Sequence, residues 1–129
     1  MEILRWKTRI AVLWIFMAVA MSAHSIFSFM VPELVEEMWE TEMGQGMMLL
    51  MALFWWIPMV MAVLSLTLKD SANRWTNFTV GIVFTILNIV HLMEHLAEPS
   101  ADMILLIGST IVVTALIAWF AWRWPKPQT

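Results

Sequence analysis

The chain has 129 residues, of which 61% are hydrophobic and 13% are charged, and its formal net charge at pH 7 is −3. With a mean hydropathy of +0.79 it is too apolar for an ordinary soluble domain, so we expect one membrane domain over residues 1–129 and no separate soluble catalytic module. The absence of cysteine excludes disulfide exchange, thiolate metal sites and iron–sulfur ligation. The seven basic residues are too scattered for a nucleic-acid-binding surface.

Four apolar segments predict an all-α, four-helix transmembrane bundle, with spans at about residues 10–31, 47–68, 75–93 and 103–122. The first corresponds to about 33 Å of helix at a rise of 1.5 Å per residue, which is enough to cross a hydrocarbon core of ~30 Å. It is too long for the apolar part of a typical signal peptide, so we expect it to remain as a span. Pro58, near the centre of the second span, removes a backbone hydrogen bond and predicts a kink.

The basic residues are confined to three of the five segments outside the spans. They precede the first span, separate the second from the third and follow the fourth: Arg5, Lys7, Arg9, Lys69, Arg74, Arg123 and Lys126. The other two connections contain no lysine or arginine. By the positive-inside rule, the N and C termini and the middle connection are cytoplasmic, and we expect a multi-pass protein of the cell (plasma or inner) membrane.

The connection after the first span predicts a short amphipathic helix in the first outer loop. Pro32 suits the first helical position, and Leu34, Val35, Met38 and Trp39 repeat at helical spacing. The five glutamates of this connection form a solvated acidic face or recruit cations, and the sequence leaves both alternatives open.

Tryptophan and methionine are frequent, with nine and 13 residues. Trp6, Trp75, Trp122 and Trp124 lie near the cytoplasmic ends of the spans, where their amphipathic rings are typical of headgroup-level anchors. Most methionines are spread through the spans at helical spacing, which favours packing over copper(I) binding.

Several short motifs resemble an uncharacterised family of small prokaryotic proteins with four membrane spans. They are Ala11-Val12-Leu13-Trp14-Ile15, Val31-Pro32-Glu33, Ala72-Asn73-Arg74-Trp75-Thr76-Asn77 and Trp119-Phe120-Ala121-Trp122-Arg123-Trp124-Pro125-Lys126-Pro127. The resemblance implies the architecture and supplies no activity, cofactor or catalytic residue. Independently of the family, Asn73 is expected to cap the third helix, Arg74 to meet lipid phosphate and Trp75 to lie in the interface.

All three histidines fall in the outward half of the predicted bundle. His24 belongs to the first span, and His91 and His95 close the third. At about 100° per residue, six residues of the third helix fall within about 80° of one another around its axis and form a largely polar stripe: Asn77, Gly81, Phe84, Asn88, His91 and His95. Polar groups at membrane depth nearly always face a bundle interior or a wet cavity, so this stripe predicts the inward face.

These residues predict a ligand site or proton path formed by His24, Asn88, His91, Glu94 and His95. We expect the imidazoles of His24 and His91 to approach within one ligand of each other, with Asn88 beneath them and Glu94 and His95 toward the outer mouth. The histidines with Glu94 are candidate ligands for Zn²⁺, Mn²⁺ or Fe²⁺, and two facing imidazoles for haem b. Snorkelling toward water or capping of the helix end is the alternative without a ligand.

The run from His91 to His95 has the H-x-x-E-H form of one group of zinc proteases, but no third ligand follows at a familiar spacing. The sequence therefore favours a non-enzymatic role without deciding it. We expect a small integral membrane protein that binds a ligand or ion in the outward half of its bundle core. A metal- or haem-binding redox or catalytic protein and a structural accessory subunit of a membrane complex remain alternatives. The expected partners are the lipid bilayer and a second copy or larger complex, because small residues in the first and fourth spans allow close helix approach.

Overall fold

The computed structural model describes residues 2–126, and Pro127 at the end of the last motif lies outside them. The described residues form five helices joined by short connections, without strands: α1 (Glu2–Phe29), α2 (Pro32–Glu40), α3 (Gln45–Thr67), α4 (Asp70–His95) and α5 (Ala101–Trp122). Four of them, all except α2, are long and apolar enough to cross a membrane. The prediction of an all-α protein with four such helices is therefore confirmed.

The helices α1 and α4 begin several residues before the predicted spans, so each has additional turns at its N-terminal end. α1 starts at Glu2 rather than near residue 10, and α4 starts at Asp70 rather than near residue 75. The apolar runs mark the part of each helix that suits hydrocarbon, whereas the backbone hydrogen bonds continue through the polar turns beside it. Helix length and span length are thus different quantities in this chain.

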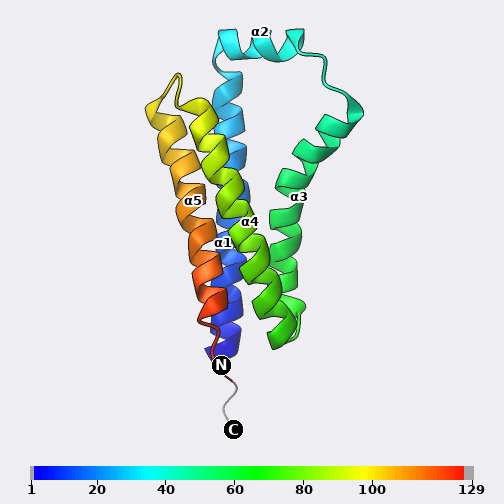
Figure 1. Ribbon diagram of the computed structural model, residues 1–129, viewed down its shortest axis with the longest axis vertical. Helices are drawn as coiled ribbons and strands as arrows, with labels where there is room; N and C mark the ends of the chain where they lie inside the picture. Colours follow the sequence, from blue (N-terminus) through cyan, green and yellow to red (C-terminus); the bar gives the residue numbers. More distant parts are fainter. Residues whose placement is uncertain (1, 127–129) are drawn as a thin grey trace.

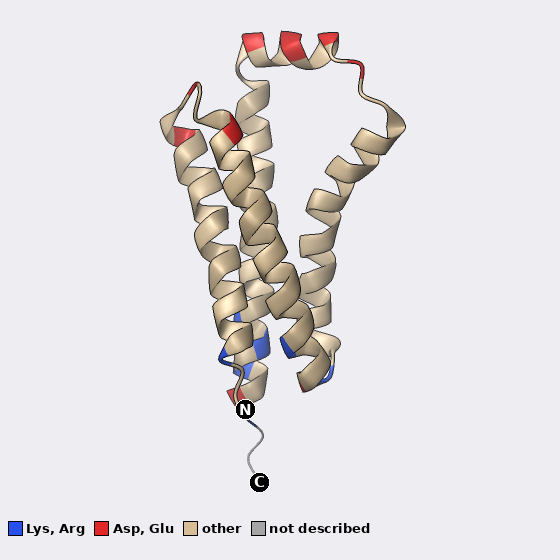
Figure 2. Ribbon diagram, in the orientation of Figure 1, with Lys and Arg blue, Asp and Glu red and all other residues tan. Residues whose placement is uncertain are grey.

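Charged side chains divide the molecule into two ends (Figure 2). Every lysine and arginine lies at the end that carries the N-terminus and the α3–α4 connection, which we call the basic end. Every aspartate and glutamate except Glu2 and Asp70 lies at the opposite end, where α2 runs across the top of Figure 2, and we call it the acidic end.

The helices pack in the order α4, α5, α1, α3, while α3 and α4 make little contact. Figure 1 shows that the part of α3 nearest α2 leans away from α4, and that α2 bridges the gap between α1 and α3. α3 contains the buried Pro58, and a proline inside a helix is a usual cause of such a bend. The bundle is therefore closed at the basic end and wedged open at the acidic end.

The close approach of α4 and α5 depends on Gly81. A methyl group at this position would lie 3.1 Å from the backbone nitrogen of Ala118 and 3.3 Å from Cγ2 of Ile117. At Gly108 of α5, by contrast, a methyl group would meet nothing within 4 Å. Small residues allow helices to approach closely in membranes, and Gly81 against Ala118 is such a contact here.

The packed core lies between α1, α3, α4 and α5. Its buried members are Ile10, Trp14, Met17, Met21, Met61, Ala62, Phe84, Val113, Ile117 and Trp124. Many large apolar side chains instead face outward on every long helix, among them Val19, Leu49, Ile86 and Leu105. An apolar exterior of this kind is stable in lipid, which agrees with a multi-pass membrane protein.

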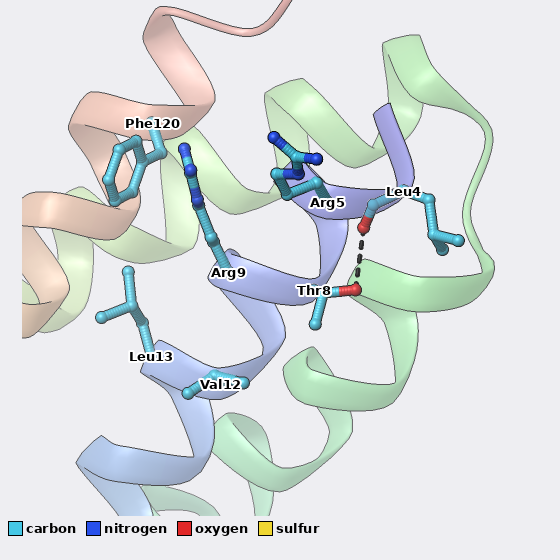
Figure 3. Close-up of a pocket in the computed structure, with 7 residues that line it drawn as sticks. All are labelled: Leu4, Arg5, Thr8, Arg9, Val12, Leu13 and Phe120. Carbon is cyan, nitrogen blue, oxygen red and sulfur yellow. Dashed lines mark hydrogen bonds between the residues drawn. The ribbon is translucent and has the colours of Figure 1, made fainter. Parts of the chain in front are cut away.

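A shallow hollow of about 580 Å³ lies on α1 at the basic end (Figure 3). Its lining residues come from the first turns of α1 and from α5: Leu4, Arg5, Thr8, Arg9, Val12, Leu13 and Phe120. The hydroxyl of Thr8 donates to the carbonyl of Leu4 at 2.8 Å, so it is already used within the helix. Two arginines thus stand beside a mostly apolar surface.

A buried polar network joins α1, α3 and α4. Oδ1 of Asn77 accepts from the indole of Trp14 at 2.7 Å and from the hydroxyl of Ser65 at 3.1 Å. The side-chain amide of Asn77 donates to Oδ1 of Asn73 at 2.6 Å, and the amide of Asn73 donates to the carbonyl of Ser65 at 2.7 Å. Each of these four side chains is fully buried. The predicted inward direction of the Asn77 stripe is confirmed by its burial together with Phe84 and Asn88.

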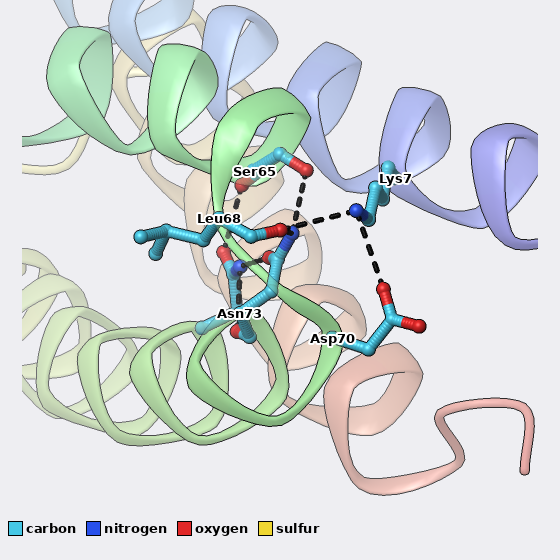
Figure 4. A network of polar contacts seen from close by, with 6 residues as sticks. Lys7, Ser65, Leu68, Asp70 and Asn73 are labelled. Carbon is cyan, nitrogen blue, oxygen red and sulfur yellow. Dashed lines mark hydrogen bonds and ion pairs between the residues drawn. The ribbon is translucent and has the colours of Figure 1, made fainter. Parts of the chain in front are cut away.

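The sequence predicted that Asn73 caps its own helix, and this prediction is wrong. α4 begins three residues earlier, after Lys69, and the Asn73 amide instead satisfies a carbonyl in the last turn of α3. Figure 4 shows that Lys7 of α1 closes the same turn, donating to the carbonyl of Leu68 at 3.0 Å and pairing with Asp70 at 3.2 Å. The last carbonyls of a helix lack intrahelical partners, so side chains from other helices meet this need here.

Arg74 also binds a helix end. Its guanidinium donates to the carbonyl of Trp122 at 3.3 Å and lies over the rings of Trp75 and Trp122, at 5.0 and 5.9 Å from their centroids. The indole of Trp6 donates to the carbonyl of Phe120 at 2.8 Å. A cation near the C-terminus of a helix interacts favourably with the helix dipole. Arg74 therefore has a packing partner on α5 in addition to any lipid.

Candidate metal site at the acidic end

The three histidines meet at the acidic end although they come from helices on opposite corners of the bundle. His24 lies on α1, whereas His91 and His95 lie one turn apart on the same face of α4. The ring centroids are 5.4 Å apart for His24 and His91, 5.4 Å for His24 and His95, and 4.6 Å for His91 and His95. One nitrogen from each ring lies within 4.8 Å of the other two, so one ion can be reached by all three.

Two nitrogens of this cluster have no hydrogen-bond partner among the described residues. Nδ1 of His24 and Nε2 of His91 are both buried and unpartnered. The hydroxyl of Ser28 donates to the backbone carbonyl of His24 at 3.0 Å rather than to its ring. A buried polar group without a partner costs about 1–3 kcal/mol. A ligand that binds these nitrogens therefore removes a cost that the fold otherwise carries.

The cluster opens into a cavity of about 540 Å³ between α1, α4 and the diverging part of α3. α2 contributes to its wall with Leu34, Glu37 and Met38. The other lining residues are Met21, His24, Ser25, Ser28, Phe29, Thr41, Met43, Met51, Trp55, His91 and His95. The lean of α3 and the crossing of α2 thus create the space in front of the imidazoles.

Asn88 and Glu94 do not join the three histidines. Asn88 is buried and faces α5, where its amide donates to the carbonyl of Thr110 at 3.4 Å and to the hydroxyl of Thr114 at 3.5 Å. Glu94 is exposed and contributes neither to the histidine cluster nor to the cavity wall. The stripe on α4 is wide enough for Asn88 and the histidines to face different neighbours, and Glu94 does not belong to it.

Several residues of the cavity were not predicted from the sequence as site residues. Glu37 is its carboxylate, and Met38 and Met43 bring thioethers to it from α2 and from the connection that follows. The amphipathic pattern of α2 indicates which residues share a face, but not that this helix crosses to α3 and covers the histidines. The signal for this arrangement is tertiary and is absent from the local sequence.

Residues 1–128 match the model of a family described as a family of unknown function, DUF6326. The chain belongs to this family. The expected resemblance to an uncharacterised family is therefore confirmed, and membership in DUF6326 assigns no activity or ligand. No curated protein and no solved structure matches the chain.

Proposed function

We propose that this protein is a multi-pass membrane protein that binds a transition-metal ion through the imidazoles of His24, His91 and His95. The observation that carries the proposal is that three imidazole nitrogens from two helices lie within 4.8 Å of one another. Neutral imidazole binds late first-row metals well, and three such ligands leave one coordination position free for a further donor. The unpartnered nitrogens of His24 and His91 add support, because metal binding would satisfy them.

The same geometry argues against the other ligands considered. A haem held by two histidines needs a flat slot for the porphyrin between their rings, whereas the three rings contact each other edge to face. A zinc protease needs a glutamate beside the metal-bound water, and the glutamate of the motif, Glu94, is exposed outside the cluster. We therefore favour metal binding without hydrolysis.

We further propose that the basic end is cytoplasmic and that the metal site opens on the outer side of the cell membrane. The segregation of basic and acidic residues supports this orientation through the positive-inside rule. Arg5 and Arg9 beside the apolar hollow of α1 also suit the level of anionic lipid headgroups. In this orientation α2 lies along the outer surface of the bundle.

The orientation is tested by single cysteines introduced into a chain that has none of its own. A membrane-impermeant thiol reagent added to intact cells should label Glu40→Cys and Glu98→Cys, and should label Ser71→Cys only after the cells are opened. Labelling of Ser71→Cys in intact cells would reverse the proposed orientation.

The metal site is tested on the purified protein with Co²⁺, whose visible absorption reports coordination by imidazole. We expect saturation at about one equivalent, as for a single three-ligand site. His24→Ala, His91→Ala and His95→Ala should each abolish or strongly weaken the spectrum. Glu94→Gln is the matched control on the same helix turn and should bind as the wild type does. Binding that survives all three histidine substitutions would refute the proposal, and circular dichroism shows whether each variant remains folded.

A further inference from the structure

The cavity in front of the three imidazoles is lined by four methionines from four segments of the chain. They are Met21 of α1, Met38 of α2, Met43 after α2 and Met51 of α3. Met21 belongs to the packed core, whereas the exposed fractions of Met38, Met43 and Met51 are 38%, 40% and 42%. Core packing explains the first residue and does not require thioethers at the other three positions. Thioether sulfur is a soft ligand that favours Cu(I).

Hard oxygen ligands are the minority in the same cavity, and one of them, the Glu37 carboxylate, carries a charge. The hydroxyls of Ser25, Ser28 and Thr41 donate to the carbonyls four residues earlier in the chain, at 3.1, 3.0 and 2.8 Å. The carboxylate among the lining residues is that of Glu37. Mg²⁺, Ca²⁺ and Mn²⁺ prefer carboxylate, carbonyl and water oxygens. The donor set is therefore made up mainly of imidazole nitrogen and thioether sulfur.

The charge of the ion matters because imidazoles and thioethers are neutral ligands. The cost of moving an ion from water into a medium of low dielectric grows with the square of its charge, so a monovalent ion pays about a quarter of the cost for a divalent ion of equal size. His24 is only 8% exposed, and the anionic lining residue is Glu37. A soft monovalent cation fits these conditions better than a divalent one.

We propose that the ion bound by His24, His91 and His95 is Cu(I), and that it reaches the imidazoles past Met38, Met43 and Met51. The inference rests on the proposed function and adds the identity of the ion. The acidic residues around the entrance attract any cation toward this end, and the methionines then select a soft one. The free coordination position is filled by the thioether of one of these three methionines.

The experiment measures Cu(I) affinity of the purified full chain in ascorbate, by competition with a coloured Cu(I) chelator. The test variant carries Met38→Leu, Met43→Leu and Met51→Leu, since leucine replaces methionine at similar volume. The matched control carries Met47→Leu and Met48→Leu, which are exposed residues of α3 outside the cavity wall. We expect the triple variant to lose Cu(I) affinity by about tenfold or more, which corresponds to about 1.4 kcal/mol. The affinity for Co²⁺ and the Cu(I) affinity of the control variant should stay unchanged.

The outcomes separate this inference from the proposed function. Equal Cu(I) affinity in the wild type and the triple variant refutes the role of the methionines. If the wild type still binds Co²⁺ through its histidines in that case, the proposed function stands. A wild type that binds neither ion refutes both. X-ray absorption at the copper edge provides an independent measurement, because a sulfur neighbour of the metal should be present in the wild type and lost in the triple variant.

Discussion

The hydrogen bond between Trp14 and Asn77 should make a measurable contribution to stability, and a double-mutant cycle can isolate it. Replacing Asn77 by leucine removes the acceptor that lies 2.7 Å from the Trp14 indole and leaves that buried N–H unpaired. The orphaned donor costs about 1–3 kcal/mol. Hydrogen bonds between transmembrane helices average about 0.6 kcal/mol and reach about 1.7 kcal/mol, because the unfolded state in the membrane also finds partners. We therefore expect Asn77→Leu to destabilise the protein by about 2 kcal/mol.

The cycle combines Asn77→Leu with Trp14→Phe, which removes the indole donor and keeps an aromatic ring against Phe84. In the Trp14→Phe background, Asn77→Leu should cost about 1 kcal/mol less than in the wild type, because no indole N–H remains to be orphaned. Reversible unfolding with sodium dodecyl sulfate in mixed micelles, followed by circular dichroism, gives the four free energies. Circular dichroism is preferred because Trp14→Phe changes the fluorescence. Equal costs in the two backgrounds would refute the assignment of this bond as a stabilising one.

Two further stability predictions use matched pairs of variants and the same unfolding assay. Gly81→Ala should destabilise the bundle by about 1 kcal/mol or more, because the added methyl group presses on the backbone of α5. Gly108→Ala meets open space and should be neutral or stabilising by up to about 1 kcal/mol, so equal effects at both glycines would contradict the proposed packing. Lys7→Met should destabilise by about 1 kcal/mol, because it removes the shorter of the two hydrogen bonds to the Leu68 carbonyl, leaving the 3.4 Å bond from the Asn73 amide, and also removes the ion pair with Asp70. The exposed Arg5→Met should have little effect, and a loss as large as that of Lys7→Met would show that charge at this end, rather than the specific contact, is responsible.

The number and type of the long helices were predictable because hydropathy acts locally. Each apolar run is long enough to cross hydrocarbon, and no neighbouring element is needed to recognise it. The roles of Asn73 and Arg74 were not predictable in the same way. Both bind carbonyls at the end of another helix, so their roles depend on which helix ends lie beside α4. Local capping rules apply within one helix and miss such contacts.

In the candidate site, too, features set by spacing within one helix were predictable, and features set by packing between helices were not. His91 and His95 share a face because they are four residues apart, and the depth of His24 in its helix was sufficient to expect a meeting. The partners of Asn88 on α5 and the exposure of Glu94 could not be predicted, because both depend on how α4 is rotated about its axis within the bundle. Predicting the methionines of the cavity would also require the path of α2, since Met38 reaches the cavity only because α2 crosses from α1 to α3.

The polar network around Asn77 and the histidine cluster satisfy their side chains in different ways, and this difference supports the candidate site. In the basic half, Trp14, Ser65, Asn73 and Asn77 bind one another, so their burial adds stability without requiring a ligand. Near the acidic end, by contrast, two imidazole nitrogens are left unpartnered beside a cavity, whereas the other buried unpartnered atoms of the described residues, on Arg74, Asn88 and Trp124, belong to residues outside its wall. Unpartnered nitrogens on two residues that line the same cavity are expected at a functional site, because stability is given up there for binding. On the proposed function, the closed basic half supplies the rigid frame that holds α1 and α4 in position, and the open half would exchange the metal ion without unfolding of the bundle.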